Sequence, residues 1–371
     1  MKLFEYMAKG VFTQYGIPVP KGKMVTTPEE AGAAAAEIGP AAIKVQILAG
    51  GRGKAGGIRF ADDPAGAEAE ARQMLGMELH GYTVEKLLVE EKLSIDGELY
   101  LAVTVDSSAK KPLIMASASG GVNIEEVPEG QIIKRHVDVP WGMRPYIGRD
   151  LARRLGLEGG LARQFADIAV KLYKVFESTD AEMAEINPLV ISGDRLIAAD
   201  GRLNIDDEAL FRQPDLPRTS EATPLEAKVR EIGLSYVELD GDIAVMANGA
   251  GITMATIDVL ARYGGKAMNF LDAGGGAAVE PMAQAMGVLV STNPKAILVN
   301  IFGGITRCDD VAKAIIHVKK NQGIPVPLVV RLVGTNEEEG VELLRQEGIQ
   351  AYRSMDEAAA RVVELARGGG N

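Results

Sequence analysis

The second half of the sequence repeats one local pattern, in which a short apolar run leads into a glycine-rich turn and then into a helix. The pattern occurs four times, at the apolar runs 243–247, 267–271, 296–302 and 328–333. Alternating strands and helices predict a parallel, doubly wound sheet, because parallel strands need a crossover connection. Ligands of such sheets bind where the carboxyl ends of the strands meet, so we expect a ligand edge along these turns.

The first half has a different rhythm and predicts an α+β domain with antiparallel sheet. Its apolar strand candidates lie at 42–47, 84–89, 99–105, 112–116, 184–191 and 195–199. A helix with one apolar face is predicted over about 161–177. Three prolines within residues 212–224 indicate a linker. We therefore expect a first domain over 1–228, with its linker at about 212–228, and a second over 229–371.

Composition excludes several classes of protein. A net charge of −11 argues against a nucleic-acid-binding surface, which needs basic clusters. There is no apolar run of about 18 residues, so no membrane span is expected. The single cysteine, Cys308, allows no intramolecular disulfide and fits a reducing compartment. The first residues lack the features of a signal or transit peptide, which favours a cytoplasmic protein. A mitochondrial matrix protein after removal of its transit peptide would look the same.

A glycine loop, Ala49–Gly57, is the first candidate for chemistry. Its glycines would let backbone N–H groups approach phosphate oxygens, and Arg52 and Lys54 add positive charge. The loop lacks the GxxxxGK[ST] pattern, and no helical pattern follows it directly, so it is neither a Walker A motif nor a dinucleotide fingerprint. Lys44, in the strand just upstream, could reach a phosphate. The alternatives are a mobile surface loop with incidental charge and an edge lysine that extends into solvent.

The second candidate is a group of oxygen-bearing side chains. Glu185 and Asn187 fall on one face of a strand because side chains alternate along it. Asp200 ends the next strand across a short hairpin, so all three can converge. Carboxylate and amide oxygens suit Mg²⁺, which takes a few protein oxygens together with nucleotide phosphates and water. The alternative is that these are polar residues at the end of a hairpin.

The third candidate is the row of glycine turns in the second half. Gly304-Ile305-Thr306 precedes a helix whose N-terminal N–H groups would favour an anion, and Asn248 follows an earlier strand of the series. A single turn of this kind needs no ligand, but several at one edge favour a ligand edge. No histidine lies in these turns, so the chain offers no obvious histidine nucleophile.

Taken together, these motifs resemble the β subunit of succinate–CoA ligase (succinyl-CoA synthetase). The matching stretches run in order along nearly the whole chain, and include Leu3–Tyr6, Gln46–Gly57, Leu88–Glu90, Glu185–Leu189, Ala209–Pro214, Asn248–Gly251 and Asn300–Cys308. The resemblance implies an ATP-grasp domain with two subdomains, followed by a flavodoxin-like CoA-ligase domain. It also implies a reversible acid–thiol ligase of the tricarboxylic acid cycle, which couples succinyl-CoA, phosphate and a nucleoside diphosphate to succinate, CoA and the triphosphate.

The resemblance assigns roles position by position. The nucleotide-binding residues would be Lys44, Gly51, Arg52, Gly53, Glu90, Leu93 and Glu98, with Leu93 acting through its backbone. Asn187 and Asp200 would bind Mg²⁺, and Glu185 would orient the partner's histidine. The succinate and phosphate site, shared with the partner, would include Asn248, Gly304, Ile305 and Thr306.

The implied partner is an α subunit, in an αβ or α2β2 assembly, which carries most of the CoA site and the phosphorylated histidine. Each β subunit would hold one Mg²⁺, and both ATP/ADP and GTP/GDP stay open, because Pro20 beside the base pocket decides neither. The alternatives are a malate–CoA ligase β subunit and another ATP-grasp acid ligase. A nucleotide-binding regulatory subunit without catalysis is disfavoured, because Glu185, Asn187 and Asp200 are all present.

Overall fold

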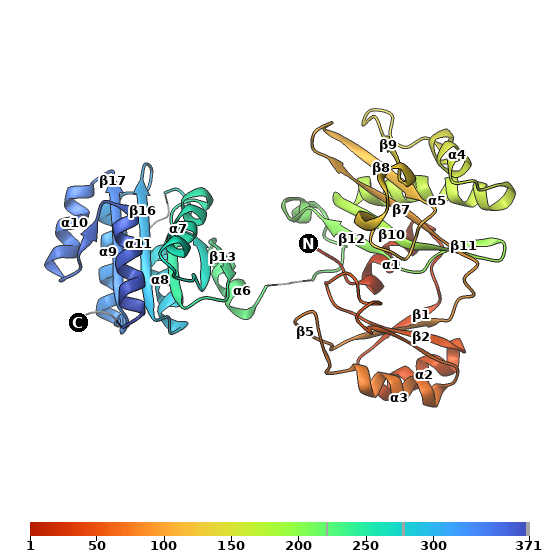
Figure 1. Cartoon of the computed structure of the whole chain (residues 1–371), viewed down its shortest axis with the longest axis horizontal. Helices are drawn as coiled ribbons and strands as arrows, with labels where there is room; N and C mark the ends of the chain where they lie inside the picture. Colours follow the sequence, from red (N-terminus) through yellow and green to blue (C-terminus); the bar gives the residue numbers. More distant parts are fainter. Residues whose placement is uncertain (220–221, 277–278, 369–371) are drawn as a thin grey trace. The chain divides into compact units, whose positions relative to one another are not determined.

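A computed structural model describes residues 1–219, 222–276 and 279–368. Its contacts divide the chain into two compact units, Met1–Glu221 and Ala222–Asn371, each with its own sheets and helices (Figure 1). The second unit begins with helix α6 (Pro224–Glu231), which occupies the end of the segment predicted as linker. The helix starts there because Thr223 and Glu226 form a reciprocal capping box and proline stands in its first turn.

The first unit contains a small antiparallel sheet with strand order β1-β6-β2-β3. Its strands are β1 (Gly22–Val25), β2 (Ala41–Val45), β3 (Ile58–Ala61) and β6 (Leu87–Glu91). Helices α2 (Pro28–Ile38) and α3 (Pro64–Met74) cover one face, and the hairpin of β4 (Glu78–Leu79) and β5 (Tyr82–Thr83) adjoins it (Figure 1). The glycine loop therefore joins β2 to β3, two strands of one sheet.

A larger antiparallel sheet completes the first unit, in the order β11-β10-β7-β8-β9 with β12 also paired to β10. Its strands are β7 (Gly97–Asp106), β8 (Lys111–Ser117), β9 (Ile133–His136), β10 (Ala181–Ser192), β11 (Arg195–Ala198) and β12 (Arg202–Ile205). Helices α4 (Pro145–Arg154) and α5 (Gly159–Ser178) belong to the same core, which buries the predicted apolar face of α5. Short 3₁₀ turns lie at Ile124–Glu126, Glu129–Gln131 and Asp207–Arg212.

Helix α1 (Glu5–Gln14) connects the two sheets of this unit. Its apolar side chains, including Val11 and Phe12, are buried in the core of the larger sheet. On its other side Lys9 forms an ion pair with Glu90 of β6, in the smaller sheet. The chain just before the helix pairs antiparallel with β12: Lys2 forms a bridge to Asn204, and the Leu3 N–H donates to the Leu203 carbonyl at 3.0 Å. The N-terminus is therefore built into the fold at the junction of both sheets.

The second unit confirms the predicted doubly wound sheet. Its order is β13-β15-β14-β16-β17-β18, in which all neighbours are parallel except the antiparallel edge strand β13. The five parallel strands follow the flavodoxin-like order, with the second strand outside the first. The strands are β13 (Ser235–Glu238), β14 (Ile243–Ala247), β15 (Asn269–Asp272), β16 (Ala296–Gly303), β17 (Leu328–Gly334) and β18 (Ala351–Tyr352).

Helices cover both faces of this sheet. Two separate apolar clusters form, one under α8 (Val279–Ser291), α9 (Cys308–Asn321) and α10 (Glu337–Gln346), the other under α7 (Ala250–Arg262) and α11 (Met355–Ala366). The edge strand β13 was not predicted. In the part of the chain that the structure describes, none of the helices combines the length and the apolar character needed to cross a bilayer.

We expect Phe12→Ala to lower the free energy of unfolding by about 3–5 kcal/mol, because it would leave a cavity in the core beside Gly201. Urea unfolding followed by circular dichroism measures the change. Phe211→Ala is the matched control, because Phe211 is 81% exposed and its loss should change stability by no more than about 0.5 kcal/mol. Equal effects of the two substitutions would contradict the packing role of α1.

Candidate active site

The first unit contains a cavity of about 470 Å³ at the junction of its two sheets. The glycine loop forms one wall, with Gly51, Arg52 and Gly53 among the lining residues. Glu185, Asn187 and Asp200 line the same cavity. The structure therefore brings together six of the residues that the sequence singled out, drawn from segments about 150 positions apart.

Asn187 lies where strand β10 leaves its regular pairing. The register with β7 shifts between Ile186 and Leu189, so the residues between them are free of the ladder. The side chain of Asn187 instead contacts the loop after β8: its Oδ1 accepts the Gly121 N–H at 2.8 Å, and its Nδ2 donates to the Val122 carbonyl at 3.0 Å. This bulge turns the amide group toward the cavity wall formed by residues 121–125.

Asp200 lies in the turn between β11 and β12 rather than at the end of a strand. The Arg52 Nη2 donates to both carboxylate oxygens at 2.9 Å, and the Gly201 N–H donates to Oδ1 at 2.7 Å. The Arg52–Asp200 pair connects the glycine loop of one sheet to the hairpin of the other. A carboxylate has about four lone-pair positions, so these bonds leave Asp200 able to accept a further ligand.

The donor set at this position fits Mg²⁺. Asn187 and Asp200 offer amide and carboxylate oxygens on the same cavity. Among the described residues there is no group of three or more His, Cys, Asp and Glu side chains arranged to hold a metal ion. A site with two protein oxygens suits a cation that keeps several waters and is also bound by phosphates.

Glu185 is half-buried on strand β10, opposite Arg202 of β12. Burial raises the pKa of its carboxyl group, while the positive charge of Arg202 and a hydrogen bond from Tyr100 act in the opposite direction. The Tyr100 hydroxyl donates to Oε2 at 3.3 Å, and burial raises the pKa of that phenol as well. Glu185 is therefore a desolvated carboxyl group held in a defined orientation at the cavity.

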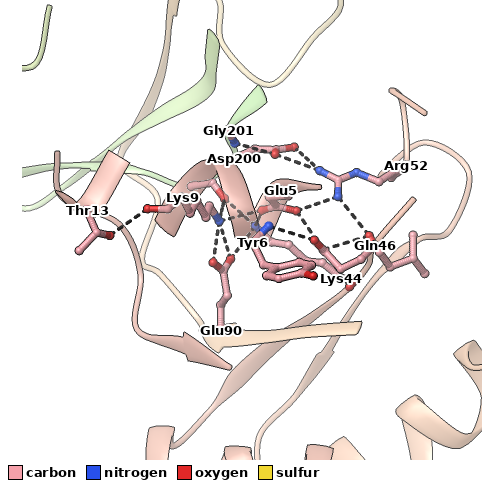
Figure 2. A network of polar contacts seen from close by, with 12 residues as sticks. Glu5, Tyr6, Lys9, Thr13, Lys44, Gln46, Arg52, Glu90, Asp200 and Gly201 are labelled. Carbon is pink, nitrogen blue, oxygen red and sulfur yellow. Dashed lines mark hydrogen bonds and ion pairs between the residues drawn. The ribbon is translucent and has the colours of Figure 1, made fainter. Parts of the chain in front are cut away.

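Lys44 and Glu90 lie beside the cavity, in a buried network of charged groups (Figure 2). The Lys44 Nζ is 2.9 Å from Glu90 Oε2 and 3.0 Å from Glu5 Oε1, and it donates to the Ala199 carbonyl at 2.6 Å. Lys9 makes the same three kinds of contact, to Glu90 at 2.6 Å, to Glu5 at 2.7 Å and to Ala199 at 2.6 Å. The two ammonium groups thus share their acceptors.

Glu5 extends this network to the glycine loop. Its Oε2 lies 2.8 Å from Arg52 Nη1, so one carboxylate contacts three cations (Figure 2). Burial raises the pKa of Glu5, but the charges of Lys44, Lys9 and Arg52 together lower it well below its usual range. Burial lowers the pKa of Lys44, and the carboxylates of Glu5 and Glu90 raise it further than burial lowers it. Glu5 and Lys44 therefore stay ionised at neutral pH.

Leu93 and Glu98 do not line the cavity in this structure. Leu93 is half-buried in the connection between β6 and β7. Glu98 lies on β7 with its carboxylate against Gly121, next to the loop that contacts Asn187. Sequence reasoning assigned no role to Glu5 and Lys9. Their opposite charges, four residues apart as on one face of a helix, were the signal that could have found them.

In the second unit, the turn after β16 contacts the end of β14. Asn248 bridges them: its Oδ1 accepts the Phe302 N–H at 2.9 Å, and its Nδ2 donates to the Phe302 carbonyl at 3.0 Å. The Asn248 Nδ2 is also 3.4 Å from the Thr306 Oγ1, which accepts the Gly276 N–H at 2.9 Å. Gly304 is exposed, Ile305 is 83% exposed and Thr306 is buried. The structure therefore brings these four predicted residues together at the carboxyl edge of the sheet.

Helix α9 begins at Cys308, four positions after Gly304. The helix therefore starts a few residues beyond the glycine turn. The turn at the end of β17 holds the Gly303–Thr306 turn in place. Gly334 has φ +122°, and a Cβ atom there would lie 2.1 Å from the Gly303 carbonyl oxygen. Only glycine at position 334 lets the two backbones approach so closely. The Thr335 N–H can then donate to the Gly303 carbonyl oxygen at 2.9 Å. The Gly303–Thr306 turn is thus held from both neighbouring strands.

The chain matches two families of protein domains, which together define its class. The ATP-grasp domain family matches residues 2–191 and the CoA-ligase family matches residues 246–365. The fold resembles that of ATP citrate lyase from Methanothrix soehngenii, solved in complex with citrate and coenzyme A, with TM-score 0.79 at 21% identity over 99% of each chain.

Full-length relatives then give the family. The chain is 47% identical to a protein of Chloroflexus aurantiacus over 99% of its own length and 100% of the relative's. It is 44% identical to a protein of Rubrobacter xylanophilus over 100% of both chains. Both relatives are named succinate–CoA ligase (ADP-forming) subunit beta. The chain belongs to this family of acid–thiol ligase β subunits.

Asp309 anchors the start of α9 beside the Gly304–Thr306 turn, and its side chain is 1% exposed. Hydrogen bonds from Arg307 and Lys313 lower its pKa, against the effect of desolvation, and Asn336 adds a third bond. A lowered pKa in the folded state gives stability that is present above about pH 4 and is lost as pH falls further. Asp309 therefore stabilises the second unit at neutral pH.

We expect Asp309→Asn to lower the free energy of unfolding at pH 7 by about 1–3 kcal/mol, because it weakens charged hydrogen bonds to a buried side chain. The difference from the unsubstituted protein should shrink as pH falls from 7 to 3. Thermal unfolding across that range measures it. Asp258→Asn, on an exposed position of α7, is the control, and a difference that stays constant with pH would contradict the assignment.

Proposed function

We propose that this chain is the β subunit of a succinate–CoA ligase, which converts succinyl-CoA, phosphate and ADP reversibly into succinate, CoA and ATP. The observation that carries this proposal is the convergence of the glycine loop with Glu185, Asn187 and Asp200 on one cavity, in a chain that matches such subunits over its full length. The adenine nucleotide follows from the names of the relatives, which are ADP-forming.

The nucleotide would bind in the first unit. Backbone N–H groups of Gly51 and Gly53 and the guanidinium of Arg52 line the cavity and suit phosphate oxygens. Lys44 adds a buried positive charge beside them. Glu90, Leu93 and Glu98 belong to β6, β7 and their connection, and we assign them to the rest of the nucleotide on the strength of the family resemblance.

Asn187 and Asp200 would hold Mg²⁺. When bound, the cation would neutralise phosphate charge and fix the phosphate geometry, which phosphoryl transfer needs more than covalent assistance. Asp200 already orients Arg52 through two hydrogen bonds, and so places the guanidinium at the cavity wall. Glu185 would accept a hydrogen bond from the incoming histidine of the α subunit and orient its ring toward the phosphoryl group.

The second unit would bind the acid and phosphate together with the α subunit. The exposed Gly304–Ile305 turn and the side chains of Asn248 and Thr306 form an edge typical of anion sites in doubly wound sheets. CoA would bind mainly to the α subunit. Because the two sites lie in different units of the chain, a histidine-bearing segment of the α subunit would carry the phosphoryl group between them.

The assembly would be an αβ heterodimer or α2β2, and the enzyme would work in the bacterial cytoplasm or the mitochondrial matrix. The names of the relatives favour succinate over malate as the acid.

The proposal as a whole is tested by transfer of label to the α subunit. Incubation of both chains with γ-labelled ATP and Mg²⁺ should place an acid-labile label on α, and succinate with CoA should then discharge it. Omission of this chain should abolish labelling. Discharge by malate but not by succinate would identify malate as the acid substrate. Absence of label on the α subunit with both ATP and GTP would refute the proposed reaction.

We expect Asp200→Ala to reduce labelling of the α subunit by about 100-fold or more, because it removes a metal ligand and the partner of Arg52. Thermal unfolding should show that the fold survives. Asp62→Asn is the control, because Asp62 is an exposed partner of Lys92 on the surface of the smaller sheet. Turnover that stays unchanged in Asp200→Ala would refute the metal assignment.

We expect Asn248→Ala to separate the two half-reactions. Labelling of the α subunit by ATP should persist, whereas discharge by succinate and CoA should fall about tenfold or more, because Asn248 orients the Gly303–Thr306 turn. Rapid-quench measurement of both steps distinguishes them. Asn321→Ala, at the far end of α9, should leave both steps intact, and equal loss of both steps in Asn248→Ala would argue against this division.

A further inference from the structure

The carboxylate of Glu5 lies at the centre of the charges that surround the cavity (Figure 2). Its Oε1 is 2.7 Å from Lys9 Nζ and 3.0 Å from Lys44 Nζ, and its Oε2 is 2.8 Å from Arg52 Nη1. Glu5 also lines the cavity itself, next to the glycine loop. It therefore contacts at once the two cations that the proposed function assigns to nucleotide phosphates.

The network that Glu5 joins is electrically balanced. Three carboxylates, of Glu5, Glu90 and Asp200, face three cations, of Lys9, Lys44 and Arg52. Glu5, Lys9 and Glu90 are each less than 5% exposed, so water screens these charges little. In such surroundings the loss of one member changes the potential felt by an anion in the cavity, and the sign of that change depends on which member is lost.

We propose that Glu5 positions Lys44 and Arg52 and, by offsetting one of their charges, limits how tightly the cavity holds nucleotide phosphates; Lys9 acts in the opposite sense, through Glu5 and Glu90. This inference rests on the proposed nucleotide site. It concerns positioning residues, because Glu5 and Lys9 act through the residues assigned to the phosphates.

A physical reason supports such a limit. An enzyme that works in both directions must release the nucleoside triphosphate as well as the diphosphate. Uniformly tighter binding of both nucleotides would slow that release without lowering the barrier to phosphoryl transfer. Without the charge of Glu5, Lys44 and Arg52 would keep Glu90 and Asp200 as partners, but the remaining excess of positive charge would attract the phosphates of both nucleotides. Glu5 keeps both cations in place while it cancels part of that attraction.

Binding of MgADP to the full chain, measured by calorimetry, tests the inference. Glu5→Gln leaves the network with one excess positive charge, and MgADP should bind at least threefold more tightly. Lys9→Met leaves one excess negative charge, and MgADP should bind at least threefold more weakly. The double variant restores the balance and should lie within about twofold of the unsubstituted chain.

Glu37→Gln and Lys23→Met are the matched controls, because these residues form an exposed ion pair on the same unit. Thermal unfolding of every variant reports the fold. If Glu5→Gln fails to fold, the comparison of Lys9→Met with the double variant still tests the inference. The double variant should bind MgADP at least threefold more tightly than Lys9→Met does.

A merely structural role for the network predicts weaker binding in both single variants, and that result would overturn the inference. Unchanged binding in both would overturn it as well. Failure of the unsubstituted chain to bind MgADP would refute the proposed nucleotide site, and this inference with it. Opposite shifts of MgADP affinity in the two single variants would support the inference without any measurement of catalysis.

Discussion

The first unit depends on one buried cluster of ion pairs, which joins its two sheets at the N-terminal helix. Glu5 and Lys9 come from α1, Lys44 and Glu90 from the smaller sheet, and Asp200 from the hairpin of the larger sheet. Buried charges cost free energy unless they are paired and hydrogen-bonded, and here each is. The cluster is therefore weak evidence for stability as such. It fixes how the two sheets meet, and with that the wall of the cavity.

The same cluster explains why Arg52 has one defined place in a loop rich in glycine. Glycine residues leave the backbone many conformations, and the guanidinium limits them by contacting Glu5 on one side and Asp200 on the other. The loop keeps its exposed N–H groups near the cavity as a result. In the second unit close backbone approach at Gly303 and Gly334 holds the corresponding turn, and the buried Asp309, paired with Arg307 and Lys313, anchors the helix that follows it.

Sequence reasoning predicted four of the five parallel strands of the second unit, since each of these four contains an apolar run that leads into a glycine-rich turn, but it missed the short strand β18. It missed β13, a short edge strand whose Ser235–Glu238 run carries only one buried residue. In the first unit it placed Glu185, Asn187 and Asp200 together correctly, from strand alternation and a short hairpin. It could not place Lys44 and Glu90, because their surroundings depend on α1, about 40 and 80 residues away. Ion pairs between distant segments leave no periodic trace in a sequence.

The division of the chain into two units has a chemical consequence. The cavity beside Asp200 combines oxygen ligands with cations that are already neutralised, and so suits an anion that arrives with its own metal ion. The edge beside Asn248 and Thr306 offers amide and hydroxyl groups and backbone N–H groups. The first environment suits a highly charged polyphosphate and the second a singly phosphorylated or carboxylate group. If one phosphoryl group visits both, it leaves ATP in the first and meets the acid in the second when ATP is consumed, and it moves in the reverse order when the proposed reaction forms ATP.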